Sequence, residues 1–140
     1  LLAGVSLAVM AAAVILLVLP GKTQSPTTGY ASIPDLIVVT APLPQSIVVS
    51  SFVVKGEARG PWFFEASFPI ELRNAQGEVI AQGYGQAQGE WMTEEFVRFE
   101  SIPLAFPAQP KGSAGTLVVH KDNPSGLPEH DRSLSIPVTF

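Results

Sequence analysis

A stretch in the middle of the chain alternates apolar and polar side chains strictly enough to indicate its secondary structure. From residue 64 to residue 72 every second side chain is apolar, and these are Phe64, Ala66, Phe68, Ile70 and Leu72. A period of two is typical of a β-strand that buries one face, because successive side chains point to opposite sides. A Gly60-Pro61 turn precedes the run. We therefore predict that residues 60–72 form the central strand of a sheet, with Phe64 inside and Phe63 on the opposite face.

Similar short runs fill the rest of the chain between turns rich in Pro and Gly, and none has the period of an amphipathic helix. We predict seven to eight strands, at residues 36–40, 46–50, 52–58, 60–72, 79–84, 96–106, 115–121 and 134–140. A change of parity predicts a bulge near Glu100 and Ser101. Gly83 and Gly85 indicate a bend or a close backbone approach. The expected fold class is all-β: an immunoglobulin-like antiparallel β-sandwich over residues 35–140.

The first nineteen residues form one uncharged apolar run. As a helix they would rise about 28 Å, close to the roughly 30 Å of a bilayer's hydrocarbon core. We predict a transmembrane helix or signal anchor at residues 1–19 and a flexible linker rich in Pro, Ser and Thr at residues 20–34. A cleaved signal peptide is the alternative, but Pro20-Gly21 after the run is a poor cleavage context.

Charge and cysteine content restrict the partners. The net charge is −4 and the eight Lys and Arg residues are scattered, so we expect no binding to nucleic acid. The chain has no cysteine, which removes disulfides, thiol chemistry and a lipidated Cys. An exported domain of this composition must then depend on apolar burial for its stability.

Two groups of residues are candidates for binding. Trp62, Phe63 and Trp91 could present aromatic surface to a glycan or a peptide, although large aromatic side chains more often serve the core. Phe63 is the best candidate for exposure because of its parity. The loop 122–131 offers Asp122, Asn123 and Ser125, which could suit Ca²⁺ but lack the spacing of a calcium loop and are common turn residues. We therefore predict no metal site.

Catalysis has little support in the sequence. The chain has two His residues, no Cys and no Gly-x-Ser-x-Gly motif. Glu94 and Glu95 are adjacent, which in a strand would point them apart. We expect no enzymatic activity and no cofactor.

Three separated stretches resemble one known family. They are Gly60-Pro61-Trp62-Phe63-Phe64, Gly89-Glu90-Trp91-Met92-Thr93 and Lys121-Asp122-Asn123-Pro124-Ser125-Gly126, with a terminal Ile136-Pro137-Val138-Thr139-Phe140. In this order they resemble the Gmad-type immunoglobulin-like domain of bacterial spore germination. The resemblance implies an immunoglobulin-like fold, a place outside the cytoplasmic membrane, a lipoprotein or single-span anchor, and no catalysis.

Together these features predict a single-pass protein of the cytoplasmic membrane with its domain outside the cytoplasm. We expect a non-catalytic binding or structural module of the bacterial envelope, in contact with an envelope protein or a cell-wall component. The family resemblance adds a relation to sporulation or germination as a further expectation. The rival interpretation is a processed subunit of a surface filament, whose apolar N-terminal helix packs in the fibre and whose sandwich lies outside. Pro20-Gly21 would end such a helix after about five turns, which weighs against it.

Overall fold

The computed structural model describes residues 29–140, which form eight β-strands and two short 3-10 helices. They are β1 (Ala31–Ile33), β2 (Ile37–Ala41), β3 (Lys55–Arg59), η1 (Gly60–Trp62), β4 (Ser67–Arg73), β5 (Val79–Ala87), β6 (Phe96–Ser101), β7 (Ala114–His120), η2 (Pro128–His130) and β8 (Ser133–Thr139). None of the helices within residues 29–140 has the length and apolar character needed to cross a membrane. The helix predicted for residues 1–19 and the linker up to residue 28 lie outside the described range.

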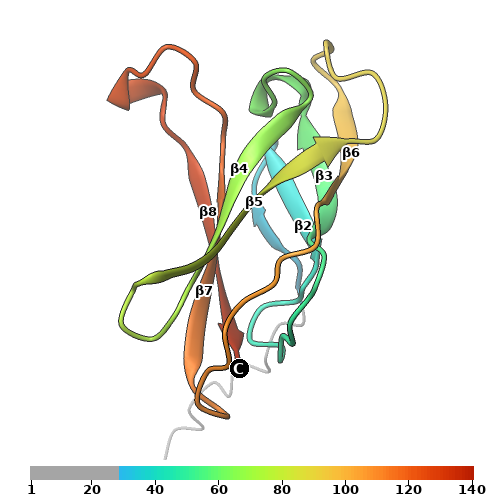
Figure 1. Ribbon diagram of the computed structural model, residues 1–140. Helices are drawn as coiled ribbons and strands as arrows, with labels where there is room; N and C mark the ends of the chain where they lie inside the picture. Colours follow the sequence, from blue (N-terminus) through green and yellow to red (C-terminus); the bar gives the residue numbers. More distant parts are fainter. Residues whose placement is uncertain (1–28) are drawn as a thin grey trace, which may run out of the picture.

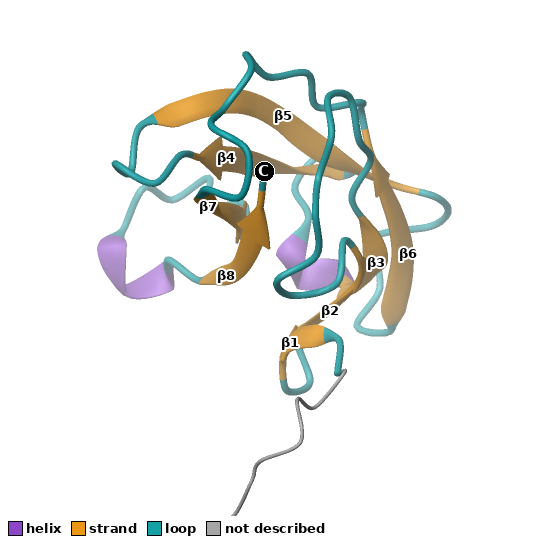
Figure 2. Cartoon of the chain, turned by 90° about the horizontal axis from the view of Figure 1, so that it is seen from below, coloured by secondary structure: helices purple, strands orange, loops and turns teal. Residues whose placement is uncertain are grey.

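The strands pair antiparallel in the order β1-β2-β3-β6-β5-β4-β7-β8 (Figure 1). The long strand β5 pairs with β4 along most of its length but with β6 only through residues 85–87. The sheet folds over at this junction, so that β2, β3 and β6 face β4, β7 and β8 (Figure 2). The prediction of an all-β antiparallel fold with seven to eight strands is therefore confirmed.

The core lies between the two facing halves. Most strands contribute alternate residues to it, as the period of two predicts, whereas β7 buries Leu117, Val118 and Val119 in succession. The largest fully buried side chains are Ile37, Val39, Val54, Trp62, Phe68, Ile70, Leu72, Leu104, Leu117, Val119 and Ile136. Phe68 sits at the centre and meets Phe63 and Phe99 edge-to-face, at centroid distances of 5.2 and 4.8 Å. Burial of each such side chain contributes about 1.5–3 kcal/mol to folding.

The predicted strand over residues 60–72 is correct only in its second half. Glu65 and Ala66 both have positive φ, at 48° and 64°, and Phe64 and Ser67 exchange backbone hydrogen bonds of 2.9 and 3.1 Å across them. This is the geometry of a two-residue type I′ turn. The turn inverts the parity before residue 67, so Phe63 is buried at 4% exposure whereas Phe64 is 43% exposed.

Two further boundaries differ from the predictions. Strand β1 lies inside the range 20–34 predicted as linker, and it pairs with β2 from Ala31 to Ile33. Residues 46–50 form no strand of their own. Instead Val48 is buried and donates a backbone hydrogen bond of 2.9 Å to Thr139, which leaves Ile47 and Val49 exposed on either side.

The bulge expected near Glu100 and Ser101 is replaced by the end of β6 at Ser101. This serine is the buried polar side chain of the core, and its Oγ accepts a 2.8 Å hydrogen bond from the Val54 amide. Gly83 and Gly85, predicted to mark a bend or a close backbone approach, lie within β5, and side chains rather than another backbone approach them closely. A Cβ at Gly85 would collide with the ring of Phe68.

Candidate functional site: the loop end of the sandwich

Four connections meet at one end of the sandwich, at the top of Figure 1. They are the β1–β2 turn, residues 60–66, residues 88–95 and residues 121–132, and we call this surface the loop end. It is the end at which β3, β5 and β7 finish and β4, β6 and β8 begin, because the strands alternate in direction. Loops held by a rigid sandwich are the usual place for recognition in this architecture.

Backbone hydrogen bonds join these connections to one another. Gly60 donates to the carbonyl of Glu95 at 3.1 Å, and Asp122 donates to the carbonyl of Trp62 at 3.0 Å. A Cβ at Gly60 would clash with the backbone of Thr93, so a glycine is needed where these two segments cross. The loop end is therefore a connected surface and not a set of independent loops.

The side chain of Arg59 links two of these connections through its contacts. Its guanidinium lies 4.1 Å from the centroid of Phe96, donates to the carbonyls of Asp35 and Glu94 at 3.2 and 3.3 Å, and lies 3.8 Å from the carboxylate of Glu95. A planar group with several donors suits this bridging position better than a lysine would. Arg59 could not be recognised from the sequence, because no periodic pattern distinguishes it from other charged residues that end a strand.

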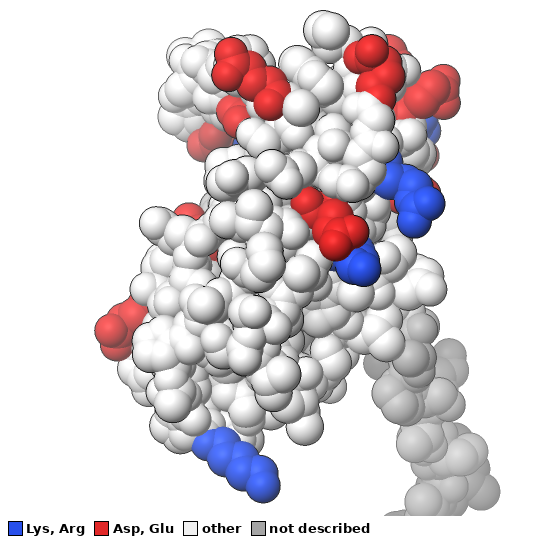
Figure 3. All heavy atoms as spheres, turned by 45° about the vertical axis from the view of Figure 1, so that its right-hand side comes forward, with Lys and Arg blue, Asp and Glu red and all other residues white. Residues whose placement is uncertain are grey.

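Most of the acidic side chains of the domain lie at the loop end (Figure 3). There are eight: Asp35, Glu65, Glu90, Glu94, Glu95, Asp122, Glu129 and Asp131. The basic residues there are Arg59, Lys121 and Arg132, so the net charge is −8 + 3 = −5 with neutral His. The remaining described residues carry four acidic and four basic side chains, which balance. The excess negative charge of the described domain is thus confined to one end.

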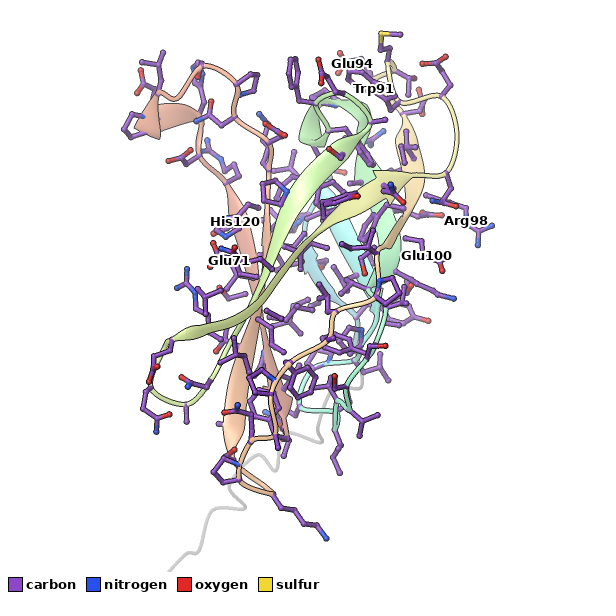
Figure 4. The ribbon with its side chains drawn as sticks, in the orientation of Figure 1. Glu71, Trp91, Glu94, Arg98, Glu100 and His120 are labelled. Atoms are coloured by element: carbon purple, nitrogen blue, oxygen red, sulfur yellow. The ribbon has the colours of Figure 1, made fainter. Side chains whose placement is uncertain are left out.

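Two shallow hollows adjoin on this surface. One, of about 350 Å³, is lined by Gly60, Pro61, Phe63, Trp91, Met92, Thr93 and Glu94. The other, of about 370 Å³, is lined by Asp35, Leu36, Arg59, Pro61, Trp62, Glu94 and Lys121. Pro61 and Glu94 line both, so they form the ridge between the hollows. In Figure 4 Trp91 and Glu94 lie together at this end of the molecule.

The three aromatic candidates lie in different environments. Trp62 is buried at 1% exposure, packs edge-to-face against Phe68, and forms part of the core. Its Nε1 has no hydrogen-bond partner among the described residues. Phe63, predicted to be exposed, is buried because of the turn at Glu65 and Ala66. Trp91 is partly buried against the core, and its remaining surface lines the first hollow.

Three apolar side chains of the loop end are exposed, and none of them was predicted as a binding candidate. Met92 is 74% exposed, Leu127 46% and Phe64 43%. Leu127 and Met92 belong to no alternating run, so they carried no periodic signal. A check for large apolar residues inside acidic loops would have identified both.

The loop 121–132 is held by its own side chains. Asn123 donates through Nδ2 to the carbonyl of Leu127 and to Oδ1 of Asp131, at 2.8 and 2.7 Å. Ser125 donates through Oγ to Oδ1 of Asn123 at 2.5 Å and accepts from the Leu127 amide at 3.2 Å. These are the local bonds expected of turn-forming residues. They bring Asn123 and Ser125 together, whereas Asp122 belongs to the junction with Trp62.

Ser125 also lies 3.1 Å from Nδ1 of His130. The pair does not resemble an activated nucleophile, because the Ser125 hydroxyl donates to Asn123 and is therefore not free to donate to the imidazole. No group of three or more His, Asp or Glu side chains that could hold a metal ion forms within residues 29–140.

Comparison with known proteins agrees with the fold. No curated protein and no solved structure matches the chain. The profile of one family does match, over residues 36–127, which are 92 of the 140 residues and include the loops 60–66 and 88–95. By this match the chain belongs to the family of immunoglobulin-like domains of bacterial spore germination.

Proposed function

We propose that this protein is a non-catalytic binding module of the bacterial envelope, held at the cytoplasmic membrane by residues 1–19 and placed outside the cytoplasm. The membership of the family supports a binding or structural role. The uncharged run of nineteen residues supports the anchor. Residues 20–28, which join the run to the described domain, can span about 35 Å at most, so the domain stays near the surface.

The observation that carries the proposal is the composition of the loop end. It combines two adjoining hollows, the exposed apolar side chains of Phe64, Met92 and Leu127 on three of its connections, and eight acidic side chains. Protein interfaces likewise combine apolar contact surface with polar groups. A net charge of −5 selects a partner that brings basic groups, and it raises the rate of association with such a partner. The partner we propose is a polypeptide segment with basic and apolar side chains.

Site-specific photocrosslinking tests this proposal in the bacterium from which the sequence comes. A photoreactive phenylalanine analogue replaces Leu127 on the loop end or Tyr84 on the outer face of β5, and these residues are 46% and 43% exposed. We expect a discrete protein adduct from position 127 and none from position 84. Glu94→Lys should reduce the adduct, whereas Glu100→Lys on β6 should leave it unchanged.

The outcomes separate the parts of the proposal. Equal adducts from positions 127 and 84, or none from 127, would refute the loop end as the binding surface. Resistance to carbonate extraction and cleavage by external protease test the anchor and its orientation. A soluble chain that has lost its first residues would support the signal peptide, and sedimenting filaments would support the fibre subunit.

A further inference from the structure

The opposite end of the sandwich is apolar and almost uncharged. It consists of the connection 41–54 between β2 and β3, the connection 74–78 between β4 and β5 and the connection 102–113 between β6 and β7, together with Tyr30 before β1. Residues 41–54 contain no charged side chain, residues 102–113 contain only Lys111, and residues 74–78 contain only Glu78. We call this surface the apolar end. On the face shown in Figure 3, acidic side chains are concentrated at the other end and the lower part is largely uncharged.

Four large apolar side chains are exposed at the apolar end: Ile47 at 73%, Val49 at 69%, Tyr30 at 59% and Leu43 at 37%. Single exposed apolar residues are common, but this group lies on neighbouring segments without a charge among them. A surface of this kind lowers its free energy when it leaves water. It therefore requires an occupant.

The exposed side chains are held in place by the segment that carries them. Gln45 donates to the carbonyl of Pro137 at 2.6 Å, and Val48 donates to the carbonyl of Thr139 at 2.9 Å. Val48 itself is buried, so its two neighbours on the chain are directed away from the core. Beneath them the rings of Phe52, Phe106 and Phe140 pack in series, with centroid distances of 6.0 and 5.3 Å. The segment that carries Ile47 and Val49 is thus fixed to the rest of the domain.

The position of this surface along the chain indicates what covers it. Tyr30 and Ala31 lie at the apolar end, because Ala31 pairs with Val39 near the end of β2. Only residues 20–28 separate the described domain from the apolar run 1–19, and their reach of about 35 Å keeps this end closest to that run. The acidic loop end lies at the far side of the domain, where an anionic membrane surface would repel it least.

We propose that the apolar end rests on the lipid bilayer, with Ile47 and Val49 inserted at the interface and Lys111 close to the headgroups. Apolar side chains that enter the interfacial region next to a cationic residue are a common way for a surface to bind lipid. The contact would fix the orientation of the domain and direct the loop end away from the membrane. This inference rests on the proposed membrane attachment.

The absence of native cysteine allows a direct test with the full chain. Ile47→Cys and Met92→Cys provide a matched pair, because these residues are 73% and 74% exposed at opposite ends. Each variant carries an environment-sensitive fluorophore and is reconstituted into phosphatidylcholine and phosphatidylglycerol vesicles, with or without brominated acyl chains. We expect blue-shifted emission and bromolipid quenching at position 47, and neither at position 92.

Each other result contradicts the inference in a distinct way. Equal quenching at both positions would mean that the domain lies on its side. A blue shift at position 47 without bromolipid quenching would mean that protein covers the surface, either a second copy or another segment of the chain. No change at position 47 in vesicles that retain the protein after carbonate would refute the lipid contact and leave the anchor intact. Loss of the protein from the vesicles would refute both.

A pair of charge substitutions provides an independent readout. Val49→Glu should abolish quenching of the label at position 47, because a carboxylate next to the interface opposes insertion. Met92→Glu, at the loop end, should leave it unchanged. Both positions are exposed, so neither change should disturb the fold, and far-UV circular dichroism checks this. Unchanged quenching in the Val49→Glu variant would contradict the proposed insertion.

Discussion

Phe63 and Phe64 are adjacent in sequence and chemically identical, yet they should contribute very differently to stability. Phe63 is 4% exposed and packs edge-to-face on Phe68, whereas Phe64 is 43% exposed. Truncation of a buried Phe to Ala removes its transfer free energy and leaves a cavity, at a cost of about 3–5 kcal/mol. Phe64→Ala removes only part of a surface contact and should cost about 1 kcal/mol.

Thermal unfolding of the full chain in non-ionic detergent, followed by near-UV circular dichroism, measures this difference. At about 4 °C per kcal/mol for a domain of this size, Phe63→Ala should lower Tm by at least about 12 °C and Phe64→Ala by about 4 °C. Tyr84→Ala is the matched control for a surface aromatic, since Tyr84 has the same exposure as Phe64.

The reverse order would refute the reasoning. If Phe64→Ala were the more destabilising change, residues 60–72 would form one continuous strand with Phe64 inside. Residues Glu65 and Ala66 would then not form a turn. Equal effects would show that the core does not distinguish the two faces at this point.

Four further changes test the local arguments. Replacement of Glu65-Ala66 by Asn-Gly should stabilise the chain by about 1–2 kcal/mol, because both residues have positive φ, and denaturant unfolding checks this. Gly85→Ala should cost about 1–3 kcal/mol through collision with Phe68, whereas Gly89→Ala, with open space around it, should be nearly neutral. Ser101→Ala should cost about 1–3 kcal/mol, since it leaves the Val54 amide unpaired, and Ser135→Ala on the exposed face of β8 is the control. Arg59→Lys should loosen residues 94–95 and increase their hydrogen exchange, because an ammonium cannot replace the planar contacts of the guanidinium.

The strands could be predicted wherever one face of a segment meets the core over several residues. β8 follows its alternation throughout, with Ile136 and Val138 buried and Pro137 exposed between them. The strand prediction is wrong at residues 60–66, because alternation shows only which residues share a face and cannot detect a two-residue turn inside an alternating run. Asn-Gly would have indicated the turn, but Glu65-Ala66 has no such preference.

The candidate site was harder to predict than the fold, for a physical reason. Its parts lie in connections that are far apart along the chain, and only the pairing of strands brings them together. Trp62 and Trp91 were candidates for binding because they are aromatic, yet Trp62 is fully buried in the core. The exposed apolar positions are Met92 and Leu127, which no periodic pattern marks, and Phe64, which the pattern placed inside.

One property of the site was nevertheless contained in the order of the strands. Successive strands in this fold alternate in direction, so every second connection lies at the same end of the sandwich. The first, third, fifth and seventh connections contain the eight acidic residues of the loop end. The second, fourth and sixth contain only Glu78 and Lys111 as charged residues. With the strand bounds of the structure, sorting the charges by alternate connections therefore gives a domain with one acidic end and one almost uncharged end. A domain so divided, with an uncharged run of nineteen residues before it in the sequence, is what the proposed contact of the apolar end with lipid and of the loop end with a protein partner would require.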